Sequence, residues 1–317
     1  MQERATYLRA ARQRTFGAKL RDPRSLDNTQ LNKLFKENML VDQAHRLMFC
    51  YVAKAGSTSY KSILIELSVR YKETFGNESV MDQVGAVRDI HDRGFMAKYG
   101  IRRFSSYSYE EKLDILANYQ KVMAVRHPLD RLYSMYFNKL RQPPAKYAPD
   151  YQKKFGLPIA LALRPKGKTK GLKRVTDITF HEFVTYFSRH PEMARDIHLK
   201  KSADWCQMHV MDYDYFMKLE TVDTDEKIFI ENIMKEKQFK DFHLNKVSSN
   251  SQDGWAQNNF TKLMKAYNGL DKDVFNRVKS FYQIDMDLFG YDASMQDNKE
   301  AILQCRTVNS TTNSVCC

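Results

Sequence analysis

The sequence lacks any long hydrophobic run. No stretch of about 18 apolar residues, the length that a helix needs to span a bilayer, occurs in the chain. Residues 1–14 also lack the apolar core of a secretory signal. We therefore expect a chain that neither crosses a membrane nor carries an export signal, so that any membrane anchor would lie outside this sequence.

Cysteine is scarce as well. The five cysteines are an odd number without Cys-x-x-Cys spacing, so they indicate neither a zinc site nor a disulfide framework, and the redox compartment stays open. They are Cys50, Cys206, Cys305, Cys316 and Cys317. Because no other group of side chains has the spacing of metal ligands, we predict no metal.

Acidic residues are outnumbered by basic ones. The 51 Lys and Arg against 38 Asp and Glu give a net charge of +13, and such a field attracts polyanions. Nucleic acid, anionic lipid and acidic polysaccharide all fit this charge. The sequence contains no RNP-like, zinc-finger or helix-turn-helix pattern, so we do not expect a nucleic-acid partner.

Composition divides the chain into three parts. Residues 1–30 read as a peripheral basic arm, residues 31–295 as one folded domain, and residues 296–317 as a polar tail. Within the domain, residues 141–175 are rich in proline and lysine, which predicts an irregular basic insertion. Its basic cluster consists of Lys166, Lys168, Lys170, Lys173 and Arg174.

Two segments of the domain pair a short apolar run with a helical pattern. Residues 47–52 predict a buried strand, and the apolar positions of residues 60–71 recur at helical spacing. Residues 122–125 predict a second strand, followed by Pro128 in the first turn of another helix. Two strand-to-helix units indicate an α/β fold with a parallel sheet and helices on its faces. A helix capped by Thr179 and a strand at residues 213–219 are also expected.

The loop between the first strand and its helix has the composition of an anion site. Its glycine lets the backbone approach an anion, its lysine adds a charge, and its hydroxyls are short donors. The predicted anion-binding residues are Lys54, Ala55, Gly56, Ser57, Thr58 and Ser59. The lysine precedes the glycine, so the loop is not the G-x-x-x-x-G-K-[ST] pattern of nucleoside triphosphatases. Taken alone, the loop is equally compatible with a plain connection.

A second anion element follows the second strand. Arg126 ends that strand, and Arg131 and Ser134 are three residues apart on the next helix, where they are expected to share a face. Arginine can bind a phosphate in a bidentate manner, and serine adds a neutral donor. In isolation, arginines that pair with carboxylates on a solvated helix would explain the pattern better.

Together the two elements resemble the Golgi carbohydrate sulfotransferases, in particular the chondroitin and dermatan 4-O-sulfotransferases and their glucuronyl 3-O relatives. The matching residues are Lys54, Gly56, Thr58, Arg126, Pro128, Arg131, Ser134, Tyr136 and Lys139. The resemblance continues through His198, Cys206, residues 213–221 and residues 288–291, and it leaves out residues 141–175. It departs from the family at Ala53, where proline is usual, and at His127, where an acid or amide is common.

The resemblance implies a three-layer, P-loop-like sulfotransferase fold with a central parallel sheet. It also implies transfer of a sulfuryl group from 3′-phosphoadenosine 5′-phosphosulfate (PAPS) to a hydroxyl of an anionic glycan, with a chondroitin-type glycosaminoglycan as the expected acceptor. The expected location is the Golgi lumen or membrane, where sequons at Asn77, Asn259 and Asn309 would permit glycosylation.

The resemblance also implies roles for single residues. Lys54 would stabilise the leaving phosphate, while Arg126 and Ser134 would hold the 3′-phosphate. His91 is the predicted general base, because histidine accepts a proton near neutral pH without a large pKa shift, and Asp89 and Asp92 flank it. His198 is the second candidate. A nucleotide kinase and a non-enzymatic polyanion-binding protein are the alternative functions.

Overall fold

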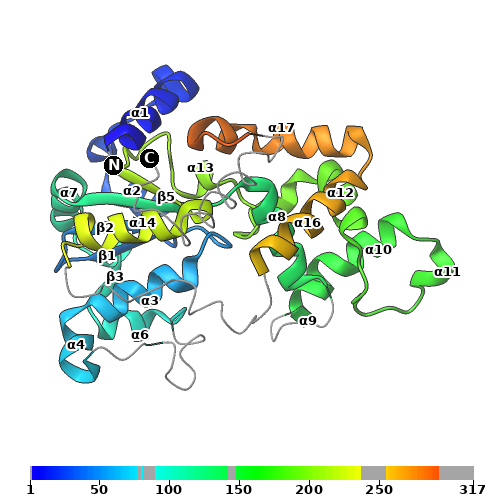
Figure 1. The fold of residues 1–317 in the computed structure, drawn as a ribbon, viewed down its shortest axis with the longest axis horizontal. Helices are drawn as coiled ribbons and strands as arrows, with labels where there is room; N and C mark the ends of the chain where they lie inside the picture. The colour runs from blue at the N-terminus through cyan, green and yellow to red at the C-terminus, as the bar shows by residue number, and fades with distance from the viewer. Residues whose placement is uncertain (1, 77–79, 81–89, 142–147, 237–254, 293–317) are drawn as a thin grey trace, which may run out of the picture.

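The fold is known from a computed structural model that describes residues 2–76, 80, 90–141, 148–236 and 255–292 (Figure 1). Its centre is a five-stranded sheet in the order β3-β1-β2-β4-β5. The strands are β1 (Met39–Asp42), β2 (Leu47–Cys50), β3 (Ile101–Arg103), β4 (Gln120–Val125) and β5 (Tyr215–Lys218). The predicted strands at residues 47–52, 122–125 and 213–219 are therefore confirmed.

The sheet is mixed. Strands β2, β4 and β5 are parallel, as predicted, whereas β1 runs antiparallel to both β2 and β3. The reason is the short turn between β1 and β2, which Arg46 closes by donating its N–H to the Gln43 carbonyl at 3.2 Å. A turn of this length joins antiparallel neighbours, because parallel strands need a long crossover.

Helices cover both faces of the sheet. Side chains alternate along β2, so that Phe49 packs into one apolar cluster while Met48 and Cys50 pack into the other. The cluster around Phe49 includes residues of α3 (Ser57–Leu67), α4 (Val69–Phe75), α6 (Arg93–Lys98) and the π-helical turn η8 (Phe229–Ile233), which follows α14 (Val222–Ile228). The predicted three-layer α/β fold is confirmed.

The opposite face carries the larger set of helices. These are α1 (Gln2–Phe16), α2 (Asn28–Phe35), α7 (Tyr109–Asn118), α8 (Pro128–Lys139), α12 (Phe180–Arg189), α13 (Ser202–Trp205), α16 (Trp255–Asn268) and α17 (Lys272–Phe289). The predicted cap of α12 is present, since Thr179 and Glu182 form a capping box.

Residues 2–16 are docked rather than peripheral. They form α1, which lies against α17 and β5 and buries Leu8 and Ala11 completely or nearly so (Figure 1). Arg4 forms an ion pair with the buried carboxylate of Asp225 and donates to Thr221 Oγ1 at 3.0 Å. Arginines supply much of the contact between α1 and the rest of the domain. Because a segment rich in arginine and poor in apolar residues is typical of a solvated surface, the sequence predicted a peripheral basic arm.

The segment expected to be an irregular insertion is largely helical where it is described. It contains α9 (Ala148–Tyr151), the π-helical turn η5 (Gln152–Gly156), α10 (Leu157–Leu163) and α11 (Lys166–Thr169). Pro158 lies in the first turn of α10 and Pro165 is the N-cap of α11, where a missing N–H has no cost. The prolines therefore start helices instead of preventing them. Residues 142–147 and the predicted tail 296–317 lie outside the described residues.

Candidate functional site

The predicted anion loop lies at the carboxyl end of β2. Lys54 and Gly56 both have positive φ angles, +69° and +72°, and α3 begins directly after them. A Cβ at residue 56 would lie 3.2 Å from both Leu219 and Tyr60, so the position requires glycine for space as well as for conformation. No side chain caps α3, which leaves the amides and hydroxyls of residues 57–59 in its first turn available to an anion.

Lys54 joins this loop to the second predicted element. Its ammonium donates to Asn138 Oδ1 on α8 at 2.7 Å, and its carbonyl accepts from Arg126 Nη1 at 3.3 Å. Burial, together with the charges of Lys139 and Arg126, lowers the pKa of Lys54 to about 7. Because β2 and β4 are parallel neighbours, their carboxyl ends bring the two motifs together as expected.

The two arginines of the second element have different surroundings. Arg126 lies at the end of β4 beside the loop and forms an ion pair with Asp130 at 2.7 Å. Arg131 is only 1% exposed and donates to the backbone carbonyls of His198 and Lys200. The prediction that Arg131 shares an anion-binding face with Ser134 is therefore wrong, because position 131 falls on the inward face of α8.

His127 has a structural role. It is 1% exposed, its Nδ1 accepts from the Leu129 N–H at 3.3 Å, and its Nε2 donates to the Asp292 carbonyl at 2.8 Å. The ring thus caps α8 and ties it to the end of the described chain. An acid at this position could cap the helix but could not donate to that carbonyl.

His91 lies against the anion loop. Its Nε2 is 3.2 Å from Thr58 Oγ1 and its Nδ1 is 3.4 Å from Lys61 Nζ. Desolvation of the ring by the surrounding protein is the main cause that lowers the pKa of His91 to about 4, and the charges of Lys61 and Lys139 also lower it. The expectation of an unshifted pKa was therefore wrong. Asp92 caps α6 through the Phe95 N–H at 2.9 Å, and Asp89 lies outside the described residues.

Lys61 is a site residue that sequence reasoning missed. It is 4% exposed, and its ammonium lies 3.7 Å from the centroid of the Tyr51 ring. Burial, together with the charge of Arg103, lowers the pKa of Lys61 to about 7. In the sequence it is one lysine of an amphipathic helix, so only the spacing Thr58–Lys61, one helical turn, could have hinted at its position.

His198 reaches the same site from another direction. Its Nδ1 lies 2.9 Å from both Asp196 Oδ1 and the Tyr151 hydroxyl. Burial lowers the pKa of His198, and among the charges that act on it are those of Lys54 and Lys139. Since these two lysines also lower the pKa of His91, both candidate bases lie around one cationic centre.

Segment 148–156 completes the surroundings of His198. Tyr151 comes from α9, and Lys154 forms an ion pair with Asp196 Oδ2 at 2.7 Å. The ammonium of Lys139 lies 4.9 Å from the centroid of the Tyr151 ring. A segment that the family resemblance left out therefore contributes side chains to the site.

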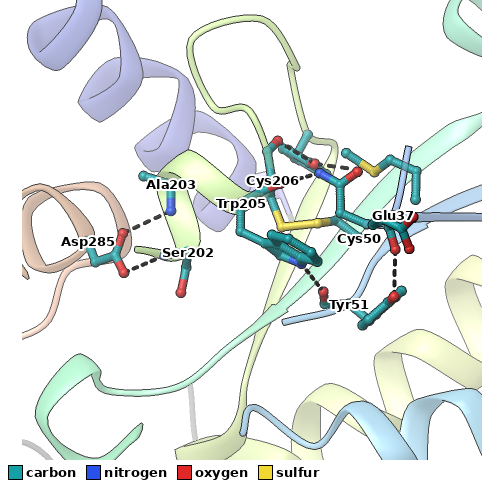
Figure 2. The surroundings of a disulfide bond; sticks show 11 residues. Glu37, Cys50, Tyr51, Ser202, Ala203, Trp205, Cys206 and Asp285 are labelled. Atoms are coloured by element: carbon teal, nitrogen blue, oxygen red, sulfur yellow. Dashed lines mark hydrogen bonds between the residues drawn. A yellow bond between two sulfur atoms is a disulfide. The ribbon is translucent and has the colours of Figure 1, made fainter. Parts of the chain in front are cut away.

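A disulfide connects β2, the strand that leads into the anion loop, to the chain that follows His198 (Figure 2). Cys50 ends β2 and Cys206 follows α13; their Cα atoms are 5.9 Å apart and they are separated by 156 residues. Trp205 Nε1 also donates to the Tyr51 carbonyl at 2.7 Å. This pairing was not predicted, because an odd set of distant cysteines does not specify partners.

Asp285 on α17 holds α13 from the other side. It accepts hydrogen bonds from the N–H groups of Ser202 and Ala203 at 2.7 and 2.9 Å (Figure 2). In the described ranges no group of three or more His, Cys, Asp or Glu side chains is arranged to hold a metal ion. Nor does any helix of those ranges have the length and apolar character to cross a membrane.

Comparison with known proteins gives a consistent set of relatives. A profile described as the sulfotransferase family matches residues 37–292. Carbohydrate sulfotransferase 9 of Homo sapiens is 26% identical over 258 residues, which cover 79% of this chain and 52% of that protein. Carbohydrate sulfotransferase 11 of Mus musculus is 27% identical over 198 residues, which cover 62% of this chain and 52% of that protein.

A third relative is covered further. Carbohydrate sulfotransferase 10 of Xenopus laevis is 26% identical over 275 residues, which cover 84% of this chain and 71% of that protein. The chain spans about half the length of the first two of these relatives. No solved structure matches the chain.

Proposed function

Because the chain belongs to the sulfotransferase family, with residues 37–292 matching its profile, we propose that it transfers a sulfuryl group from PAPS to a hydroxyl of a carbohydrate. One observation carries this proposal. The loop at residues 54–59 and Arg126 meet at the carboxyl ends of two neighbouring parallel strands, with Arg126 Nη1 3.3 Å from the Lys54 carbonyl. Ligands of α/β sheets bind at such edges.

The loop fits the 5′-phosphosulfate end of the donor. The uncapped first turn of α3 offers amides and hydroxyls from residues 57–59, and Ala55 and Gly56 supply backbone that an anion can approach. Lys54 stands beside them as the cation for the leaving phosphate. A bound anion raises the pKa of a neighbouring lysine, so Lys54 would be charged when the donor is present.

The second element fits the 3′-phosphate. Arg126 supplies a guanidinium and Ser134, half-buried on α8, supplies a hydroxyl. ATP has no 3′-phosphate, so these two residues would select PAPS over ATP. The proton of the acceptor hydroxyl would go to one of two histidines, His91, which was predicted from the sequence, or His198. The scheme requires no metal.

The acceptor that we propose is an anionic glycan of the chondroitin type. The net charge of +13 favours a polyanion, and the relatives are named carbohydrate sulfotransferases. The buried Cys50–Cys206 disulfide supports an oxidising compartment and hence the Golgi lumen. Among the sequons, Asn77 and Asn309 lie outside the described residues and Asn259 lies in α16.

Nucleotide binding tests the function first. We expect adenosine 3′,5′-diphosphate (PAP) to raise the melting temperature, and ATP with Mg²⁺ to leave it unchanged. Stabilisation by ATP with Mg²⁺ alone would favour a nucleotide kinase, and stabilisation by neither would favour a non-enzymatic polyanion-binding protein. Labelled PAPS offered with desulfated chondroitin, dermatan, heparosan and glucuronyl glycans then identifies the acceptor.

A further inference from the structure

Asp196, His198 and Tyr151 form one hydrogen-bonded cluster that contacts Lys139, the neighbour on α8 of Asn138, to which Lys54 donates. The side chains of Asp196 and His198 are 6% and 15% exposed, and their Oδ1 and Nδ1 atoms lie 2.9 Å apart. The Tyr151 hydroxyl is also 2.9 Å from His198 Nδ1. Lys154 holds the second carboxylate oxygen of Asp196 at 2.7 Å. The Nδ1 side of the ring is therefore held by residues of two segments, 151–154 and 196–198.

We propose that His198 is the catalytic base that takes the proton of the acceptor hydroxyl, and that Asp196 is the positioning residue that prepares it. This inference rests on the proposed sulfotransferase function. An ionised carboxylate can only accept, so the 2.9 Å contact places the imidazole proton on Nδ1 and the lone pair on Nε2. Within the described residues, Nε2 has no hydrogen bond to a protein group. The arrangement is that of a histidine backed by aspartate in acyl-transfer enzymes.

His91 has the opposite hydrogen-bond polarity. The group nearest its Nδ1 is the ammonium of Lys61, which can only donate while it is charged. The imidazole proton then lies on Nε2 and points toward Thr58 Oγ1, 3.2 Å away in the anion loop. His91 is thus arranged to donate a hydrogen bond to an anion in the loop, together with Thr58, rather than to accept a proton.

The proposed step forms one oxygen–sulfur bond, breaks another and moves one proton. The acceptor oxygen bonds to sulfur as its proton passes to Nε2 of His198. The bond between sulfur and the bridging oxygen of the 5′-phosphate breaks, and its electron pair stays on that phosphate beside Lys54. His198 becomes an imidazolium, which the negative charge of Asp196 stabilises, and it later returns the proton to water.

The surrounding charges bear on the pH dependence of this step. Burial would raise the pKa of Asp196, but hydrogen bonds from His198 and Lys154 outweigh burial and hold it well below its ordinary value. The carboxylate is therefore ionised throughout the working range. Burial and the cations Lys54 and Lys139 lower the pKa of His198, against the opposing effect of Asp196. A neutral His198 near pH 7 follows, which is the state that a base requires.

Two variants, His198→Ala and Asp196→Asn, test the assignment with PAPS and desulfated chondroitin as substrates. PAP release from PAPS without glycan is measured in parallel, because water then replaces the acceptor. We expect His198→Ala to lower kcat by roughly 10²- to 10⁴-fold in both assays while PAP binding is retained. Added imidazole should restore part of the activity. Asp196→Asn, which can turn an N–H toward the ring, should lower kcat on the order of 10²-fold and shift the acidic limb of the pH profile.

The matched control is His190→Ala. His190 Nδ1 also lies 3.0 Å from a carboxylate two residues away, Glu192 Oε1, but its side chain is 41% exposed. We expect wild-type kcat. Should His198→Ala fold poorly, His198→Gln keeps a donor for Asp196 without a base and must show the same loss.

Each result separates the inference from the proposed function. Wild-type protein that neither binds PAP nor turns over PAPS overturns both. Wild-type protein that turns over PAPS, together with His198→Ala at full kcat, overturns the assignment of His198 alone. The assignment of His198 is also overturned if His91→Ala has a lower kcat that imidazole restores, while imidazole does not restore the kcat of His198→Ala.

Discussion

Lys54 combines an unusual backbone with a central position at the proposed donor site. Its φ of +69° is uncommon for a residue other than glycine, and such conformations persist where surrounding contacts enforce them. Here the enforcing contacts are those of its ammonium with Asn138 and of its carbonyl with Arg126. The lysine is thereby held with its charge beside the first turn of α3.

Variants of Lys54 and Ser134 should affect opposite ends of PAPS. We expect Lys54→Ala to lower kcat by roughly 10²-fold or more, because it removes charge that stabilises the leaving phosphate in the transition state. Ser134→Ala should mainly weaken PAP binding, with a smaller change in kcat. Initial-rate kinetics and calorimetric titration with PAP measure the two effects. Normal turnover and normal PAP affinity in both variants would mean that the donor lies elsewhere.

Gly56→Ala should damage the loop in two ways. An L-residue at positive φ costs about 1 kcal/mol, and the new Cβ would also lie 3.2 Å from Leu219 and Tyr60. Gly100→Ala is the matched control, since Gly100 has a φ of +82° but nothing within 4 Å of a Cβ. We expect both variants to lose stability in urea unfolding, Gly56→Ala by more, and only Gly56→Ala to lose PAP affinity. Equal effects on both measurements would contradict the packing argument.

For single residues, the sequence predicted those of the anion loop but not the residues that surround it in the folded chain. Lys54, Gly56 and Arg126 are adjacent to strand ends, so local patterns were sufficient to place them. Lys61 and Tyr151 reach the site through tertiary contacts between helices, and no local pattern reports such contacts. The inward turn of Arg131 was missed for the same reason, since helical spacing fixes relative positions on α8 but not which face is buried.

Among the elements, the Cys50–Cys206 bridge holds β2 against α13 (Figure 2). A bridge across 156 residues restricts the unfolded chain strongly, so we expect Cys206→Ala to lower the free energy of unfolding by about 2–5 kcal/mol. Guanidinium unfolding measures this loss. The double variant Cys50→Ala/Cys206→Ala should lose about as much as the single one, and a much larger loss would mean that packing of the side chains, rather than the bond, is responsible.

The basic cluster that follows α10 offers a test of acceptor binding. Lys166 and Lys168 belong to α11, which Figure 1 shows at the end of the molecule away from the sheet. Changing Lys166, Lys168, Lys170 and Lys173 to Gln should raise the acceptor KM at low salt and flatten its salt dependence, without changing PAP affinity. The charge-matched control changes four other exposed lysines, Lys33, Lys262, Lys265 and Lys272. If both sets act alike, only the net charge matters.

Strands β2, β4 and β5 and their parallel arrangement were predictable, whereas β1 and the helices between residues 148 and 169 were not. The buried runs at β2, β4 and β5 are continuous and apolar, which is typical of parallel strands covered on both faces. Strand β1 was not predicted, because its four residues are no more apolar than many helix segments. The helices between residues 148 and 169 were missed since proline was taken as a breaker, although it is also favoured in the first turn of a helix.

In the whole molecule, His45 and His91 make the free energy of unfolding depend on pH in opposite directions. Burial lowers the pKa of His45, but hydrogen bonds to Asp42 at 2.5 Å and to Glu236 at 3.2 Å outweigh it, and the pKa is raised. The contribution of His45 to the free energy of unfolding is therefore full below the pKa of an unfolded histidine, about 6.5. It is lost as the pH rises through the higher pKa of the folded state. The pKa of His91 is lowered to about 4, so stability from His91 is full above about pH 6.5 and is lost as pH falls toward 4.

Urea unfolding at pH 5.5 and 8.5 should separate the two groups. We expect His45→Ala to lose more stability at pH 5.5 than at pH 8.5, because the charged ring with its two carboxylates is removed. His91→Ala should instead make the protein relatively more stable at pH 5.5. Parallel pH dependences of both variants and wild type would show that neither ring titrates differently in the folded state.

The family could be predicted from two ordered anion motifs, and the match over residues 37–292 confirms it. The three-layer fold followed from the same strand-to-helix units. The docking of α1 could not be predicted, because many of its contacts are made by arginines, which in sequence indicate a solvated surface. The side chains of the candidate site come from α8, α9 and the loop after α12, and their combination exists only in the folded chain.

The docking of α1 also bears on the order in which the protein is made. Its partners are β5 and α17, and Tyr7 donates to the Asp287 carbonyl at 3.0 Å (Figure 1). A ribosome releases α1 long before β5 and α17, and domains fold as their segments emerge. Until β5 and α17 have been made, the basic helix α1 has no folded surface to bind. Asp225, the ion-pair partner of Arg4, is made before α17 completes that surface. Helix α1 is therefore translated well before it can pack, so termination of translation before α17 should leave α1 without the surface that it binds.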